Sequence, residues 1–157
     1  MLFRSGMLCM DDGEPLKAEE WFKKAIHLRP DFRSALFNLA LLLNEQKRPK
    51  EALPFLKQLM DHYPEHIKGL ILIGDIYTNY VKDLDKAEQA YRRILEIDAT
   101  HVQGHHNLCV VMVEKGHLKA AHSCLLKVHA MAPDQAYILK HLSIVESRLE
   151  AANTKQP

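Results

Sequence analysis

The feature that most constrains this chain is a pattern that returns at an almost fixed interval. Pro30, Pro64, Ala99 and Pro133 are separated by 34, 35 and 34 residues. Before each of them lies a small residue, followed by apolar residues four and seven places later, which share one face of a helix. These triplets are Ala18-Phe22-Ala25, Ala52-Leu56-Leu59, Ala87-Tyr91-Ile94 and Ala121-Leu125-Val128. A period of this length predicts a repeat protein in which helix pairs stack on their neighbours.

The first half of each unit carries a second pattern, in which an apolar residue precedes an apolar-small pair and then another bulky residue. It recurs as Leu36…Leu39-Ala40…Leu43, Leu70…Ile73-Gly74…Tyr77 and His105…Leu108-Cys109…Met112, and more weakly as Leu2…Ser5-Gly6…Cys9. Together the two patterns resemble the tetratricopeptide repeat (TPR) over residues 2–133. The resemblance implies an all-α fold, a right-handed α-solenoid of about four TPR helix pairs plus a C-terminal capping helix.

The repeat frame divides the chain into units at about 1–32, 33–66, 67–101 and 102–135, a cap helix at 136–150, and a flexible tail at 151–157. Residues 1–150 are expected to form one solenoid. Asp31, Thr100 and Asp134 precede predicted helices, where their side chains could cap the first turn. One extra residue between Tyr77 and Ala87 is expected to lengthen the turn around Asp83, Leu84 and Asp85. Met1 falls inside a predicted helix, so we expect a segment of a longer protein.

Charge and hydropathy narrow the classes of partner. Lys plus Arg number 21 and Asp plus Glu number 20, so no charge excess favours nucleic acid. No stretch approaches the roughly 18 consecutive apolar residues of a membrane span, and we expect no membrane contact from this segment itself.

Cysteine and histidine are the residue types that could form a disulfide or a metal site in this chain. The three cysteines contain no CxxC, and Cys9 and Cys109 occupy core places, which favours buried small side chains. The alternative is a Cys109–Cys124 bond in an oxidising compartment. Among ten histidines, His101 and His105 share a helix face, as do His122 and His129, but neither pair reaches the three or four ligands of a zinc site.

The sequence contains no catalytic motif and no glycine-rich phosphate loop. We therefore predict no metal, no cofactor and no catalysis by this chain alone.

The remaining functional surface is the groove that the first helix of each TPR pair lines. The repeat frame places there Phe37, Leu41, Asn44, Ile71, Asp75, His106, Val110, Val113, Lys140 and Ile144, as well as Thr78 and Ser147. This mainly apolar set predicts a binding groove for a protein or peptide ligand, the alternative being plain packing between helices.

Some TPR domains hold acidic chaperone C-termini with a clamp of lysines, asparagines and an arginine. At the corresponding places of repeats one to three this chain has Phe3, Met7, Asn38, Lys68 and Leu72, of which only Asn38 and Lys68 fit. A chaperone co-factor role through that clamp is therefore disfavoured.

A more specific resemblance covers Leu70 to Leu149. The motifs Gly74-Asp75-Ile76-Tyr77, Gln103-Gly104-His105-His106-Asn107-Leu108-Cys109-Val110-Val111, Ser123-Cys124-Leu125-Leu126 and Tyr137-Ile138…His141-Leu142-Ser143-Ile144-Val145 are similar to the transmembrane and tetratricopeptide repeat-containing (TMTC) family.

That resemblance implies the C-terminal, lumenal TPR region of an endoplasmic reticulum membrane protein. The parent would be a dolichyl-phosphate-mannose-dependent protein O-mannosyltransferase that acts on cadherins. The chain would then be a protein-protein interaction scaffold that holds a peptide or protein acceptor, possessing none of the transferase half. The alternative is a free-standing cytosolic TPR adaptor, or a co-chaperone-like assembly factor.

Overall fold

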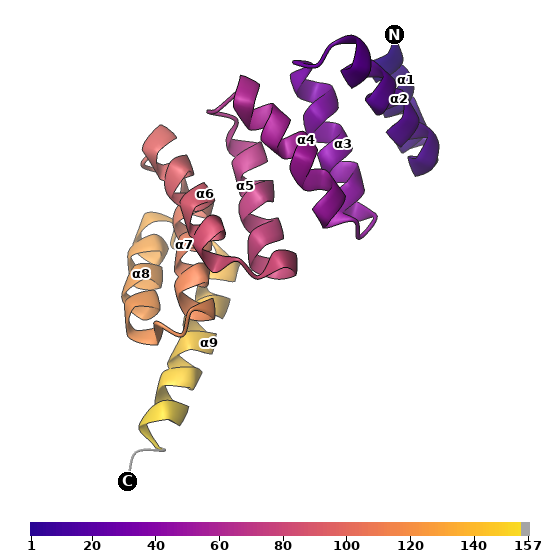
Figure 1. Cartoon of the computed structure of the whole chain (residues 1–157). Helices are drawn as coiled ribbons and strands as arrows, with labels where there is room; N and C mark the ends of the chain where they lie inside the picture. The colour runs from indigo at the N-terminus through magenta and orange to yellow at the C-terminus, as the bar shows by residue number, and fades with distance from the viewer. Residues whose placement is uncertain (155–157) are drawn as a thin grey trace. The chain divides into compact units, whose positions relative to one another are not determined.

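The fold is described from a computed structural model, which covers residues 1–154 and contains helices but no strand in that range (Figure 1). The all-α TPR solenoid predicted from the sequence is confirmed. The chain forms two compact units, Met1–Val81 and the residues from Lys82 onward. The boundary lies inside the third predicted repeat.

The first unit consists of five α-helices and a short π-helical segment. They are α1 (Leu2–Asp11), α2 (Pro15–Leu28), α3 (Arg33–Glu45), α4 (Pro49–His62), α5 (Ile67–Ile76) and η1 (Tyr77–Val81). Along α1 to α5 each helix packs against the next one in sequence. Ala18 and Ala52 are fully buried, as are Phe22 and Leu56 one turn later, so each repeating triplet faces the core.

The second unit contains α6 (Leu84–Ile97), α7 (Val102–Glu114), α8 (Leu118–Met131) and α9 (Ala136–Asn153). Ala87 and Ala121 have no exposed surface, which repeats the arrangement of the first unit. Ile138, Leu142 and Val145 of α9 pack in one core with residues of α7 and α8. Helix α9 also continues to Asn153, beyond the predicted end at 150, so the predicted tail begins as helix. The rest of that tail, 155–157, lies outside the described residues.

The extra residue of the third repeat is absorbed within a helix. Gly74 follows Ala40 by 34 residues, whereas the turn residue Lys82 follows its counterpart Lys47 by 35, so the insertion lies between Gly74 and Lys82. The π-helical turn Tyr77–Val81 occupies this interval. Hydrogen bonds in a π-helical turn enclose one more residue than those in an α-helix, so such a turn can accommodate an inserted residue without lengthening the loop. The predicted lengthening around Asp83 to Asp85 is wrong, because Leu84 and Asp85 already belong to α6.

The turns within the helix pairs share one backbone conformation. Gly13, Lys47, Lys82 and Gly116 all have positive φ, at 71°, 62°, 63° and 79°. At Gly13, Lys47 and Gly116 the N–H donates to the carbonyl three residues back, and the next N–H donates to the carbonyl five residues before it. This is the Schellman ending, which needs a left-handed residue just after the helix.

The predicted caps are wrong in all three cases. The N-cap residues of α3, α7 and α9 are Phe32, His101 and Gln135. Each lies one residue after the predicted cap, so each helix begins one residue later than predicted. Thr100 instead donates its N–H and hydroxyl to the carboxylate of Asp98, at 3.0 and 2.8 Å. Thr100 therefore stabilises the turn before α7, and the next residue, His101, takes the N-cap position.

The shared turn conformation predicts opposite effects of two substitutions. Gly116→Ala should lower the free energy of unfolding by about 1 kcal/mol, since a Cβ disfavours positive φ. Lys47→Gly should leave it unchanged or raise it by up to about 1 kcal/mol, because it removes the same strain. Urea unfolding followed by circular dichroism measures both. A loss at Lys47→Gly as large as that at Gly116→Ala would contradict this explanation.

Candidate functional site

The predicted groove residues fall into two sets, one in each unit. In the first unit α3 supplies Phe37, Leu41 and Asn44, and α5 supplies Ile71 and Asp75. All five side chains are partly buried. Phe37 and Leu41 also pack against the core, and the Phe37 ring lies 5.2 Å from the His66 ring. This face, called the α3–α5 face below, is therefore a partly apolar surface supported from beneath by the core.

In the second unit the predicted residues differ more in exposure. Val113 belongs to the core and His106 is buried, so these two do not offer free surface. Val110 is partly buried on α7, whereas Lys140 and Ile144 are exposed on α9. The surface formed by Val110, Lys140 and Ile144 is called the α7–α9 face. A joint groove across both units stays a prediction.

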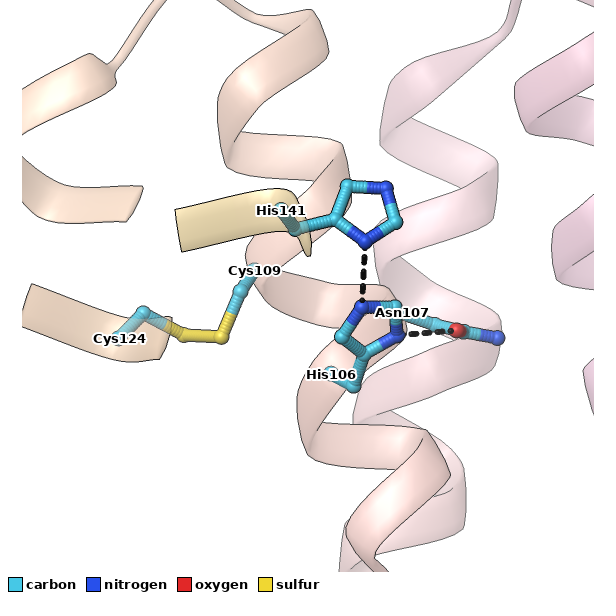
Figure 2. The surroundings of a disulfide bond; sticks show 5 residues. All are labelled: His106, Asn107, Cys109, Cys124 and His141. Carbon is cyan, nitrogen blue, oxygen red and sulfur yellow. Dashed lines mark hydrogen bonds between the residues drawn. A yellow bond between two sulfur atoms is a disulfide. The ribbon is translucent and has the colours of Figure 1, made fainter. Parts of the chain in front are cut away.

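His106 joins α7 to α9 through its imidazole ring. Its Nε2 lies 3.0 Å from Nδ1 of His141, and its Nδ1 lies 3.2 Å from the Asn107 side-chain oxygen (Figure 2). The Tyr137 ring meets it edge-on at 4.7 Å. Burial lowers the pKa of His106, and the nearby His141 acts in the same direction, so the ring is held neutral. The contact between His106 and His141 connects the two helices that form the α7–α9 face.

Cys109 and Cys124 form a disulfide that links α7 to α8 (Figure 2). The interpretation of Cys109 as a plain buried thiol is therefore wrong, and the alternative pairing holds. Position 109 is the small place of the inner helix and position 124 lies on the partner helix of the same repeat, so the two Cα atoms are 5.6 Å apart. Cys9 remains a free, partly buried thiol.

Two histidines have a role that the sequence analysis missed. The N–H of Gly69 donates to Nδ1 of His66, and that of Gly104 to Nδ1 of His101, each at 3.0 Å. His66 and His101 are thus N-caps of α5 and α7. The sequence does contain a pattern that could have revealed these caps, because His-x-x-Gly occurs twice at a separation of 35 residues. An acceptor nitrogen replaces the usual carboxylate or hydroxyl oxygen at this position.

Residues 1–154 contain neither a candidate metal cluster nor a candidate membrane span. No three His, Cys, Asp or Glu side chains in this range come together in a way that could hold a metal ion. None of the helices within the same range combines the length and hydropathy needed to cross a bilayer.

Comparison with known proteins identifies the repeats. Tetratricopeptide repeat signatures match residues 34–66 and, in a second version, residues 1–32 and 67–101. Protein O-mannosyl-transferase Tmtc3 of Drosophila melanogaster is 56% identical over 151 residues, covering 96% of this chain and 16% of the relative. Protein O-mannosyl-transferase TMTC3 of Homo sapiens is 50% identical over 155 residues, covering 99% of this chain and 17% of the relative. The predicted family resemblance is confirmed, and the chain spans about a sixth of these relatives.

Solved structures share the fold at low sequence identity. The crystal structure of MamA matches with a TM-score of 0.84 and 15% identity, covering 92% of this chain and 84% of that one. YrrB, described as a TPR protein with an unusual peptide-binding site, matches with a TM-score of 0.79 and 21% identity, covering 89% and 72%. At this identity both comparisons concern the fold alone.

The disulfide predicts a redox-dependent stability. Its cysteines are 15 residues apart, and closing a loop of this size contributes about 3 kcal/mol in the chain-entropy account. A phosphine reductant should therefore lower the melting temperature of the wild type and leave Cys109→Ala/Cys124→Ala unaffected. The control Cys9→Ala should keep the full response. Three alkylatable thiols in the unfolded, unreduced protein would contradict the bond.

The His66 cap predicts a pH dependence. Burial lowers the pKa of His66 below its ordinary 6.5, and the charges of Arg33 and Lys68 add to this. The cap's stabilisation is therefore complete above about pH 6.5 and is lost as the pH falls through the folded-state pKa. His66→Asn, which keeps a capping oxygen but does not titrate, should lose less stability between pH 7.5 and 5 than the wild type. Urea midpoints at both pH values test this, and equal losses would contradict it.

Proposed function

The chain belongs to the tetratricopeptide repeat family, and we propose that it is the partner-binding segment of a membrane protein O-mannosyltransferase. In this proposal the segment holds a protein or peptide acceptor, or a neighbouring part of the same enzyme. The transfer reaction itself takes place elsewhere in the longer protein.

One observation carries the proposal. The chain is 50–56% identical to relatives named Protein O-mannosyl-transferase over nearly its whole length. More than half of the aligned residues are identical, which exceeds the share of buried residues, so the identity includes residues outside the core. A repeat segment attached to a transferase fits a role in holding the acceptor, because helix-pair arrays present extended binding surfaces.

The two faces described above supply surfaces for such a role. The α3–α5 face presents Phe37, Leu41 and Ile71, and the α7–α9 face presents Val110 and Ile144, each beside polar groups. Apolar anchors surrounded by polar residues are typical of peptide-binding surfaces. A structural neighbour that is described by its peptide-binding site is in keeping with this use of the fold.

The disulfide supports a place for the segment in the lumen of the endoplasmic reticulum. Disulfides persist in that compartment, whereas cytosolic thiols are kept reduced. The alternative, a free-standing cytosolic TPR adaptor, would leave Cys109 and Cys124 reduced in cells. Lumenal placement would also expose the segment to acceptors that pass through the secretory pathway, among which the family resemblance suggests cadherin domains.

Substitutions on the two faces test the proposal. With a purified cadherin ectodomain as the probe, Phe37→Ala should weaken binding on the order of 2 kcal/mol, about thirtyfold in Kd, since binding energy concentrates in a few anchors. Val110→Ala removes a smaller side chain and should have a smaller effect. Biolayer interferometry with the immobilised chain measures both.

Lys127→Ala on the exposed side of α8 is the control and should bind as the wild type does. Phe37 also packs on the core, so each variant must first give the wild-type circular dichroism spectrum and melting profile. If Phe37→Ala and Val110→Ala fold and bind normally while Lys127→Ala fails, the proposed faces are wrong. Mannosyl transfer by this chain alone would also contradict the proposal.

A further inference from the structure

A cavity of about 590 Å³ opens in the first unit at the turn that joins α4 to α5. The residues around it that matter here are Arg33, His62, Tyr63, Glu65, His66 and Lys68. They come from the start of α3, the end of α4 and the start of α5. Since His66 also contacts Phe37, the cavity adjoins the α3–α5 face.

Arg33 is held in place without a carboxylate. Its guanidinium lies 5.6 Å from the centre of the Tyr63 ring, a distance typical of a cation–π contact. The Tyr63 hydroxyl donates to the Asp31 backbone carbonyl at 2.7 Å, which fixes the ring beneath the guanidinium. Within residues 1–154, neither Arg33 nor Lys68 forms an ion pair. Both cations therefore keep their hydrogen-bond donors available to a ligand.

His66 adds a third donor. Its Nδ1 accepts from Gly69, so in the neutral ring the proton resides on Nε2. The described residues provide no acceptor for that Nε2–H. The Phe37 ring lies against the His66 ring at an angle of 43°, and Arg33 and Lys68 line the same cavity as His66. One donor from the start of α3 and two from the start of α5 thus surround one cavity.

The electrostatics of the cavity favour an anion. Glu65 is its one carboxylate, against the permanent charges of Arg33 and Lys68. The cavity also borders the first turn of α5, where unpaired backbone N–H groups and the helix dipole attract negative charge. His62 borders the cavity as well and adds a further donor when neutral or charged.

We propose that this cavity binds the side-chain carboxylate of an aspartate or glutamate in an extended partner segment, which continues with an apolar residue onto Phe37. Arg33 and Lys68 would supply the charge, and the His66 Nε2–H would donate a hydrogen bond. This rests on the proposed function, of which it specifies the recognised chemistry. An internal acidic residue fits because the adjoining Phe37 gives the next residue an apolar contact.

The arrangement differs from the chaperone-type clamp considered above. The Asn38 amide, which that clamp would require, donates to the Ser34 carbonyl at 2.7 Å within its own helix. The proposed donors instead include Arg33 and the capping His66, which are not clamp positions. Lys68 is the one residue that the two arrangements share.

The test uses the full chain, isotope-labelled, with amide chemical shifts followed by NMR. The probe is the capped peptide acetyl-Gly-Ser-Asp-Leu-Ser-Gly-amide, compared with its Asn counterpart. The Asp peptide should shift the amides of Ile67, Lys68 and Gly69 and bind about tenfold more tightly than the Asn peptide, because a charged hydrogen bond is lost in the latter. Arg33→Gln and Lys68→Gln should each weaken the Asp peptide several-fold. Lys127→Gln, a matched exposed cation in the second unit, should change nothing.

Other outcomes would overturn the proposal. These are no saturable shift at about 10 mM Asp peptide, equal affinity for the Asp and Asn peptides, or unchanged binding by Arg33→Gln and Lys68→Gln. Tighter binding of an uncapped peptide with only a C-terminal carboxylate would replace the side-chain ligand by a chain terminus. Equal binding of inorganic phosphate would reduce the cavity to an unspecific anion site.

If cadherin binding is lost in Phe37→Ala but unaffected in Arg33→Gln, the proposed function holds and this inference fails. If the chain binds the Asp peptide but no cadherin ectodomain, this inference holds and the proposed function fails.

Discussion

Close packing at four buried alanines determines how the helices of this chain approach one another. Ala18, Ala52, Ala87 and Ala121 occupy the same place in the second helix of each pair, and none has exposed surface. A larger side chain there would separate the helices, because packed interiors leave no room for added methylenes. Gly6 shows how tight such contacts are, since a Cβ at this position would lie 2.7 Å from the Phe22 ring. With one side of each first helix committed to this packing, the other side is left to form the α3–α5 and α7–α9 faces.

A second interaction recurs with the repeats and involves charge. Glu19 on α2 binds Arg48, and Glu88 on α6 binds Lys115, each at 2.6 Å. In both cases a carboxylate on the second helix of one pair holds the turn of the next pair. The hydrogen bond from Arg48 lowers the pKa of Glu19, and Lys115 has the same effect on Glu88. These ion pairs therefore fix neighbouring repeats to each other in the neutral range and weaken as acid protonates the carboxylates.

The sequence predicted the parts of the structure that depend on hydrophobic periodicity. The triplets around Ala18 and Ala121 identified the buried faces because burial follows the 3.6-residue period directly. Helix caps were harder to predict. Thr100 has a good capping side chain but bonds to Asp98 instead, while His66 and His101 cap through a ring nitrogen. The disulfide depends on the compartment as well as on spacing, so the sequence left it as an alternative. Val113 was assigned to the groove by counting, yet small rotations of α7 decide whether such a residue faces the core.

The central claim is that partners bind to the faces of the first helices. Site-specific photo-crosslinking in the full-length protein tests it most directly. A benzoylphenylalanine at Ile71 on α5 or at Ile144 on α9 should yield crosslinks to an acceptor or to another part of the enzyme, identified by mass spectrometry. The same probe at Lys57 on α4 or Leu126 on α8, both exposed, should yield none above background. Crosslinks from Lys57 and Leu126 with none from Ile71 and Ile144 would place the binding surface on the second helices and contradict the account.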